Sequence, residues 1–457
     1  MLFFCIFMFV LCNRIKKTAL FHGAAIYCLT SDESRGGFIF LPWRDWLFVV
    51  DFCDYRGICF GHADFISVTF HAAKGLTDFI MKVIIHSSSV SPHQAPLILA
   101  LSKLVTRGAA EMLYTGKPAD PFRATGVHHK VAHLVRHWED SVQDWKEMDE
   151  ADVIMENHRD FNLLDRLSQT GKLILHPSER WFKPESVPFF PVPIPGFVKM
   201  LFPFAWKRAR RIVRLLKGEN RFYYLPMGLP AAQDMARLCG LLNGEWRCLF
   251  RAPRLTYENK PGGRIHTANG RDALYCLDKM RMWGYFVFPS ELKQPVVPSG
   301  KAGRHQVLWV GRFLRWKRVD DLIRAVSGLS DFDLDLYGAG PDEKRLRELA
   351  RGMDNVHFKG LVPLAEVRQL MRSHDIYALS SSAYEGWGAV VNEALEEQMR
   401  VIGTIEAGSS GTILPDSNLY HAGDWRALRR LLQAGVPSVP IGAWSVESAA
   451  KALINWK

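Results

Sequence analysis

The feature that most constrains the fold is a regular alternation of short apolar runs with amphipathic segments in the second half of the chain. Strand-like runs lie at 306–310, 334–337, 356–358, 376–378 and 400–402. Helix-like segments lie at 319–326, 341–351, 364–372 and 390–398. Parallel strands need crossover connections of about this length, so a parallel sheet is nearly the only economical way to bury these runs. This half is predicted to be an α/β domain.

The part from Met81 to about Pro295 follows the same pattern less regularly. Strand-like runs at 82–86, 152–156 and 172–176 each end in polar residues, and a helix-like stretch at 95–105 follows the first. Residues 289–300 are rich in Pro, Ser and Gly, as expected for a linker. We therefore predict two doubly wound parallel-sheet domains, at 81–295 and 300–440. Residues 441–457 are predicted to form a C-terminal helix, which could cross back and pack on the first domain.

The first eighty residues have a different composition from the rest. They hold 13 of the 28 Phe and 5 of the 8 Cys, and their charges balance. The apolar run 1–12 is shorter than the about 20 residues of a membrane span, and basic residues follow it, whereas in a signal peptide they come first. Our hypothesis is that residues 1–80 are upstream sequence and that Met81 is the working start. A short membrane anchor and a divergent extra module are the alternatives, and the intact mass of the natively expressed protein decides among them.

Charge and cysteine usage narrow the class of protein. The chain has 58 Lys and Arg against 47 Asp and Glu, and the resulting charge of +11 favours partners that carry phosphate or an anionic surface. Its composition excludes a disordered chain, a collagen-like repeat and a multi-span membrane protein. The eight cysteines form no CxxC pair and no metal-ligand spacing, which predicts reduced thiols and a cytoplasmic protein.

The most informative motif lies at 380–395, where Glu385 and Glu393 stand on either side of the turn Gly386-Trp387-Gly388. The glycines permit tight backbone geometry, and the start of the predicted helix offers free N–H groups to a diphosphate. With Glu393 about two turns into that helix, the two carboxylates are predicted to lie about 10 Å or more apart. They could then hold the two ends of a nucleotide diphosphate sugar. The alternative is a capped surface helix with ordinary glutamates.

Two further segments support a phosphate site at the same sheet edge. Arg312 and Lys317 follow the first strand of the second domain, and a guanidinium fork with a mobile ammonium suits two phosphates. Arg315 and Arg318 are expected to face solvent. Gly338 opens a Gly-x-Gly-Pro turn after the next strand and can bring backbone close to a nucleotide, although Gly-x-Gly alone is weak evidence.

These motifs together resemble the donor-binding domain of retaining glycosyltransferases of family 4, which have the GT-B fold. The similarity covers about 130 residues, 306–435, and includes Gly403-Thr404 after the fifth strand. It implies that Arg312 and Lys317 bind the donor diphosphate, that Glu393 holds the ribose and that Glu385 lies by the transferred sugar. It also implies transfer with retention of configuration, with no required metal and no cofactor.

The sequence departs from this family in two places. Many members carry a Gly-Gly turn after the first strand of the first domain, where this chain has a serine-rich loop from Ser87 to His93. The usual glycine-rich stretch after Gly403-Thr404 is replaced by Ile405-Glu406-Ala407-Gly408. The identity of the donor sugar is left open by both differences.

The first domain supplies candidates for the acceptor side. His176 ends a predicted strand and precedes a polar turn, where it could act as a base or an orienting group. His93 and Ser91 in the loop after the first strand are acceptor-side candidates as well. For both histidines, the alternative is an ordinary loop histidine that is held by a hydrogen bond. Asp333 and Asp335 mimic an Asp-x-Asp metal motif, but we expect strand-edge residues and no metal there.

Residues 187–217 combine apolar and aromatic residues with a basic cluster. Such a segment suits the interface of an anionic membrane, and the alternative is a core-facing helix with a solvated basic face. We see no nucleic-acid-binding module around these residues.

The sequence thus predicts a GT-B enzyme that transfers a sugar from a nucleotide diphosphate sugar to a glycan or lipid-linked acceptor. The expected setting is surface polysaccharide synthesis at the cytoplasmic membrane face. A nucleotide-sugar epimerase on the same fold and a non-catalytic scaffold that binds glycan or membrane are the alternatives.

Overall fold

The computed structural model describes residues 81–88, 90–105, 109–115, 130–157, 161–182, 203–291 and 303–456, and three short strands nearer the N-terminus. The chain divides into two compact units, Met1–Thr77 and Asp78–Lys457. In the first unit, β1 (Tyr27–Leu29), β2 (Phe38–Trp43) and β3 (Trp46–Asp51) form an antiparallel sheet in the order β1-β2-β3. The apolar run 1–12 lies outside the described residues.

The second unit begins with a six-stranded sheet in the order β6-β5-β4-β7-β8-β9, in which every neighbouring pair is parallel. Its strands are β4 (Lys82–Ser87), β5 (Ala109–Tyr114), β6 (Val135–His137), β7 (Val153–Glu156), β8 (Leu173–Ser178) and β9 (Phe222–Pro226). Its helices are α2 (Ala95–Leu104), α4 (Val142–Glu150), α5 (Phe161–Ser168), α6 (Pro203–Lys217) and α7 (Leu229–Leu242).

A second parallel six-stranded sheet has the order β14-β13-β12-β15-β16-β17. Its strands are β12 (His305–Val310), β13 (Phe332–Tyr337), β14 (Val356–Gly360), β15 (Ile376–Leu379), β16 (Arg400–Thr404) and β17 (Leu419–Tyr420). The helices are α8 (Val319–Val326), α9 (Glu343–Leu349), α10 (Leu364–Arg372), α11 (Val390–Glu396), α12 (Ser410–Ile413), α13 (Trp425–Ala434) and α14 (Val446–Ile454).

Between and beyond these elements lie a hairpin and several 3-10 turns. The hairpin pairs β10 (Leu255–Tyr257) with β11 (Ile265–Thr267). The turns are η2 (Ala132–Leu134), η4 (Trp246–Leu249), η5 (Asp272–Tyr275), η6 (Leu277–Lys279), η7 (Arg315–Lys317), η8 (Asp416–Asn418) and η9 (Gly442–Trp444).

Local sequence explains why these elements form. Val307, Leu308 and Trp309 of β12 are all buried, as expected for a strand covered on both faces. Helix α4 begins at a capping box, because the Ser141 hydroxyl accepts a hydrogen bond from the Asp144 amide (3.2 Å) and the Asp144 carboxylate accepts one from the Ser141 amide (3.0 Å). Both sheets therefore have apolar cores, and in α4 a side-chain cap fixes the start of a covering helix.

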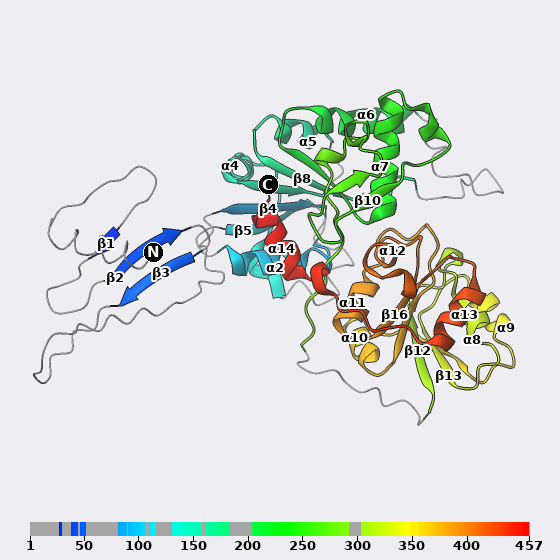
Figure 1. The fold of residues 1–457 in the computed structure, drawn as a ribbon. Helices are drawn as coiled ribbons and strands as arrows, with labels where there is room; N and C mark the ends of the chain where they lie inside the picture. The colour runs from blue at the N-terminus through cyan, green and yellow to red at the C-terminus, as the bar shows by residue number, and fades with distance from the viewer. Residues whose placement is uncertain are drawn as a thin grey trace, which may run out of the picture. The chain divides into compact units, whose positions relative to one another are not determined.

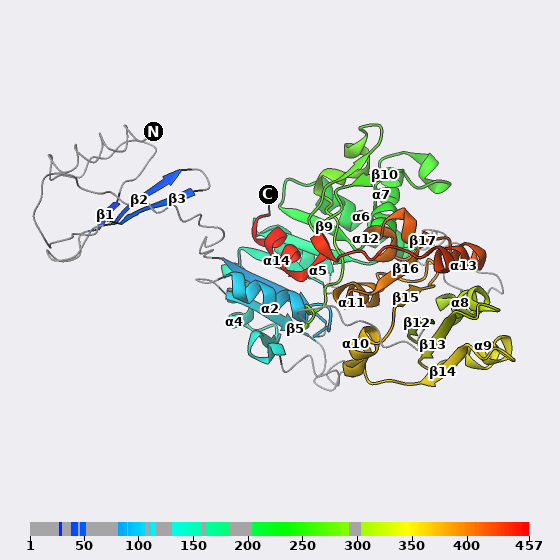
Figure 2. The same cartoon turned by 60° about the horizontal axis from the view of Figure 1, so that its bottom comes forward.

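Helices cover both faces of the second sheet, with α8, α9 and α13 on one side and α10 and α11 on the other (Figure 1). Helix α14 packs against α2 of the first sheet, and the two lie side by side in both views (Figures 1 and 2). The last helix of the chain is thus part of the layer that covers the first sheet.

Candidate functional site

The second sheet has a position at which a ligand is expected to bind. Its strand order reverses between β12 and β15, which are neighbours although β13 and β14 separate them in the sequence. Doubly wound sheets bind ligands beyond the carboxyl ends of their strands at such a reversal. The loop after β12 carries Arg312 and Lys317, and the loop after β15 carries Glu385 and the turn from Gly386 to Gly388.

An ion pair joins the two loops. Lys317 Nζ lies 2.5 Å from Glu385 Oε2, with side chains 19 % and 12 % exposed. The Ser381 hydroxyl donates to the same carboxylate oxygen at 2.8 Å, and the Ser380 hydroxyl donates to the Lys317 carbonyl at 2.7 Å. The structure therefore brings together two predicted residues that are 68 positions apart and fixes both by hydrogen bonds.

Arg312 is exposed at the same loop, and among the described residues its guanidinium has no ion-pair partner. Its basic neighbours are engaged elsewhere, since Arg315 lies 3.6 Å from Asp342 and Arg318 lies 2.6 Å from Asp321. Arg312 is therefore a cation at the strand ends that remains available to an anion.

The Gly-x-Gly turn after β13 supports the loop that carries Arg312. Gly338 has φ +143°, and a Cβ there would lie 1.8 Å from the Gly311 carbonyl oxygen. A Cβ on Gly340 would lie 2.4 Å from the Phe313 carbonyl oxygen. The Gly311 amide also donates to the Tyr337 carbonyl at 3.0 Å. Because Gly338 has no side chain, the loops that follow β12 and β13 can pack directly against each other.

The turn from Gly386 to Gly388 leads into α11, a helix of only seven residues. Trp387 in this turn is fully buried, its indole N–H donates to the Asn392 side chain at 2.8 Å, and its ring centroid lies 5.4 Å from that of Trp444. The predicted donor-binding role of Trp387 does not fit this enclosed side chain, because the indole is packed in the core.

Glu393 lies one turn into α11, where the sequence had suggested two turns. Burial raises the pKa of Glu393, Arg368 lowers it and the Glu397 carboxylate raises it, and together these effects bring the pKa to about 7. Glu397 is paired with Arg368 at 2.6 Å and Arg372 at 2.7 Å. Glu393 is therefore expected to change its protonation state near neutral pH.

His176 does not lie where the sequence placed it. It is inside β8, it is 7 % exposed, and its Nδ1 donates to the Glu156 carbonyl at 2.8 Å. Burial lowers its pKa to about 4 against the effect of that hydrogen bond, so the ring is neutral at neutral pH. The predicted role as a base or orienting group is not supported, because the side chain is part of the core beside Phe222 and Tyr224.

The first sheet instead has a pair of buried polar residues where its own strand order reverses. His86 of β4 and Glu156 of β7 are register partners, and His86 Nδ1 lies 2.6 Å from Glu156 Oε2. Both side chains are buried. Our sequence reasoning missed this pair, whose one signal is a polar residue at the carboxyl end of each strand.

His93 and Ser91 lie in the turn before α2, and the Ser91 hydroxyl accepts a hydrogen bond from the His93 amide at 3.2 Å. The His93 ring stacks on Tyr285 with centroids 4.9 Å apart. The Tyr285 hydroxyl donates to Glu179 Oε1 at 3.0 Å. Burial lowers the pKa of His93 to about 4, although the Glu179 carboxylate raises it.

Several contacts join the first-sheet region to the loops of the second sheet. Arg180 donates to the Ala383 carbonyl at 3.2 Å, and the Leu229 amide donates to the Thr412 hydroxyl at 3.1 Å. Glu179 packs directly on Gly386. The sequence reasoning missed Glu179, Arg180 and Tyr285. Glu179 and Arg180 directly follow β8, and this position at the carboxyl end of a strand was the signal that could have identified them.

The aspartates of β13 are engaged in ion pairs. Asp333 lies 2.9 Å from Arg304, and Asp335 lies 3.3 Å from Lys359. In the part of the chain that the structure describes, no group of three His, Cys, Asp or Glu side chains could hold a metal ion.

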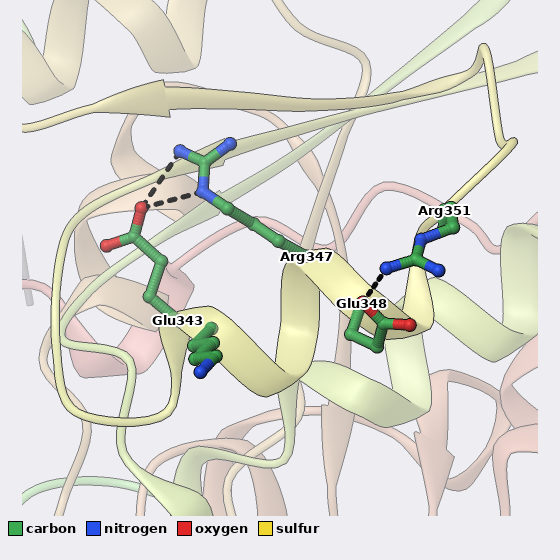
Figure 3. Close-up of a pocket in the computed structure, with 5 residues that line it drawn as sticks. Glu343, Arg347, Glu348 and Arg351 are labelled. Atoms are coloured by element: carbon green, nitrogen blue, oxygen red, sulfur yellow. Dashed lines mark hydrogen bonds and ion pairs between the residues drawn. The ribbon is translucent and has the colours of Figure 1, made fainter.

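A shallow hollow on the surface of α9 is unrelated to this site. Figure 3 shows Glu343 paired with Arg347, and Glu348 paired with Arg351, along one face of that helix. Pairs three or four residues apart are ordinary features of an exposed helix. We assign no function to this hollow.

The basic segment is described only in part, since residues 187–202 lie outside the described residues. Helix α6 begins at Pro203 and exposes Lys207, Arg208, Arg210 and Arg214. Among the described residues, no helix has the length and apolar character needed to cross a membrane.

The second-sheet region is similar to a known family of proteins. Residues 304–433 match the family model described as Glycosyl transferases group 1. This match covers all the donor-side residues singled out from the sequence and supports the resemblance to glycosyltransferases.

Curated relatives match a similar part of the chain. The UDP-N-acetylglucosamine–peptide N-acetylglucosaminyltransferase GtfA subunit of Streptococcus pneumoniae is 27% identical over 125 residues, which are 24% of this chain and 25% of that protein. The protein of the same name from Limosilactobacillus reuteri is 25% identical over 147 residues, 30% of this chain and 28% of that protein. The chain thus spans about a quarter of the length of these relatives.

Among solved structures, Alr3699/HepE from Anabaena in complex with UDP is similar with a TM-score of 0.51 and 16% identity. The match covers 82% of this chain and 94% of that one. Together with the two parallel six-stranded sheets, this likeness confirms the predicted GT-B fold.

Proposed function

We propose that this chain is a glycosyltransferase that transfers a sugar from a nucleotide diphosphate sugar to a glycan or lipid-linked acceptor. The observation that carries the proposal is the Lys317–Glu385 pair at the strand-order reversal of the second sheet. The pair lies within the segment that matches the glycosyltransferase family.

In this proposal the donor binds along the carboxyl edge of the second sheet. Arg312 and Lys317 bind the diphosphate, Glu393 accepts hydrogen bonds from the ribose hydroxyls, and Glu385 lies beside the transferred sugar. When the bond from the anomeric carbon to the phosphate oxygen breaks, negative charge develops on the leaving diphosphate. The two cations stabilise that charge, which is usually the largest contribution to catalysis of this kind.

The acceptor is proposed to enter from the first-sheet side, near His93 and Ser91. Retention of configuration, assignment to family 4 and independence of metal are parts of the proposal that rest on the sequence resemblance. UDP is the nucleotide to test first, because the GtfA relatives are named for UDP-N-acetylglucosamine and the Anabaena protein was solved with UDP.

The proposed setting is surface polysaccharide synthesis at the cytoplasmic face of a membrane. The exposed basic residues of α6 suit peripheral contact with anionic lipid, at about 1 kcal/mol for each basic residue near the membrane surface.

The proposal also includes the two domain boundaries that the sequence predicts, 81–295 and 300–440.

Nucleotide release by the full-length chain tests the proposal. Wild-type protein is incubated with UDP-sugars, with and without glycan and lipid-linked acceptors, and free UDP is measured. We expect release that depends on the acceptor and is strongly reduced in Glu385→Gln. Conversion of the donor without an acceptor would point to an epimerase, and no conversion despite donor binding would point to a non-catalytic scaffold.

A further inference from the structure

A chain of contacts links three segments of the first-sheet region to one glycine of the second: His93 stacks on Tyr285, Tyr285 donates to Glu179, and Glu179 packs on the glycine. The segments are the turn before α2 with His93, the turn after β8 with Glu179, and the stretch after η6 with Tyr285. The glycine is Gly386, the residue next to Glu385.

The contact at Gly386 is made by a carboxylate. A Cβ placed on Gly386 would lie 2.4 Å from Glu179 Oε2 and 2.7 Å from Glu179 Oε1. The Glu179 carboxylate therefore occupies the place that a side chain at position 386 would take. Gly386 directly follows Glu385, so the Glu179 carboxylate lies against the loop beside which the proposed function places the transferred sugar.

The carboxylate is held in place by its surroundings. The Tyr285 hydroxyl donates to Glu179 Oε1 at 3.0 Å, and the Tyr285 ring is itself stacked on His93. One carboxylate oxygen is thus fixed by a phenol, and the group faces the loop that carries Glu385.

The same region contains buried polar atoms that lack a partner. His93 Nδ1 and both side-chain amide atoms of Gln94 are buried without a hydrogen-bond partner among the described residues, and Gln94 is only 6 % exposed. Unsatisfied buried polar atoms are costly and rare in native proteins, and a bound polar molecule is one way to satisfy them. Of these atoms, His93 Nδ1 belongs to the ring that stacks on Tyr285, so a hydroxyl group of a ligand bound beside that ring could satisfy it.

We propose that Glu179 determines which sugar is transferred, by accepting a hydrogen bond from a hydroxyl group of the donor hexose. Tyr285 acts as a positioning residue for the carboxylate. The inference rests on the proposed function, which places the transferred sugar beside Glu385. A site built to bind a substrate hydroxyl strongly rejects analogues without it, so such a carboxylate gives selectivity among hexoses.

The test separates binding of the nucleotide from binding of the sugar. Affinities of the full chain for UDP and for UDP-glucose, UDP-galactose and UDP-N-acetylglucosamine are measured by titration calorimetry. The variants are Glu179→Gln, Glu179→Asp and Tyr285→Phe. Glu219→Gln, an exposed glutamate of the same sheet region, is the matched control. Circular dichroism melting verifies that each variant is folded.

For the UDP-sugar that binds wild-type protein most tightly, we expect about tenfold weaker binding in Glu179→Gln. We expect a smaller loss in Tyr285→Phe and in Glu179→Asp, and wild-type affinity in the control. UDP alone should bind every variant within twofold of wild type. Equal losses for UDP and UDP-sugar, or no loss for either, would overturn the role of Glu179. A wild-type chain that binds none of the four ligands would instead exclude a UDP-sugar donor, and the role of Glu179 in choosing among UDP-sugars would fall with it.

Discussion

Lys317 is the side chain whose removal tests the donor site most simply. In the free protein it pairs with Glu385 at 2.5 Å and is 19 % exposed. In the bound state we expect it to donate to the diphosphate. Lys317→Ala removes that hydrogen bond and also removes positive charge beside Glu385, so nucleotide binding should weaken for both reasons.

The size of the effect follows from the kind of bond that is lost. A hydrogen bond to a charged group contributes about 1.5–3 kcal/mol, and 1.4 kcal/mol corresponds to about a tenfold change in Kd. We therefore expect UDP to bind Lys317→Ala about 10- to 150-fold more weakly. The Lys317–Glu385 pair is mostly buried, so Lys317→Ala leaves the Glu385 carboxylate without its cation, although Ser381 still donates to it. We therefore expect a lower Tm in the variant, and binding is measured well below that Tm.

The assay is titration calorimetry of the full chain with UDP, accompanied by thermal melting. Lys451→Ala, which alters an exposed lysine of α14, is the matched control and should leave the Kd unchanged. A Kd for Lys317→Ala within twofold of wild type, in a folded sample, would refute the assignment of Lys317 to the diphosphate.

Three more predictions follow from the same geometry. Because the pKa of Glu393 is about 7 and ribose hydroxyls need an ionised carboxylate, affinity for a UDP-sugar should fall as the pH drops from 8 to 6. The phosphates of a UDP-sugar do not titrate in this range. Glu393→Gln should therefore make the affinity independent of pH, and a wild-type affinity that does not change with pH would contradict the binding of the ribose by Glu393. Gly338→Ala places a methyl group 1.8 Å from the Gly311 carbonyl oxygen at φ +143° and should cost about 2 kcal/mol or more in urea unfolding, with weakened UDP binding. Gly284→Ala places a methyl group 2.4 Å from the buried ring of Trp387 and should lower the free energy of unfolding by about 1–3 kcal/mol, which is measured as a lower Tm. An unchanged Tm would show that the segments around Gly284 and Trp387 do not pack as described.

The second sheet was predictable because its strands are apolar runs of ordinary length separated by helices with a clear period. The helices at 319–326 and 364–372 were predicted with the bounds that the structure has. The first sheet was harder, and β5, β6 and β9 were not identified. Strand β5 carries Glu111 among its apolar residues, and β6 has only three residues, so neither gives a clear apolar signal.

The proximity of Lys317 and Glu385 was predictable for a related reason. Each lies on the loop that follows a strand, and parallel strands place their carboxyl ends at one edge. Residues that meet only through tertiary packing gave no such signal. Tyr285 lies outside any strand or helix, and its contact with Glu179 joins positions 106 apart. His176 was misplaced because β8 continues two residues beyond it, through Pro177 to Ser178.

A crystal structure of the full chain with UDP tests the central claim most directly. The account predicts the diphosphate beyond the carboxyl ends of β12 and β15, within hydrogen-bond distance of Arg312 and Lys317, with the ribose at Glu393. UDP bound elsewhere, or bound at this edge without contact to either cation, would contradict it.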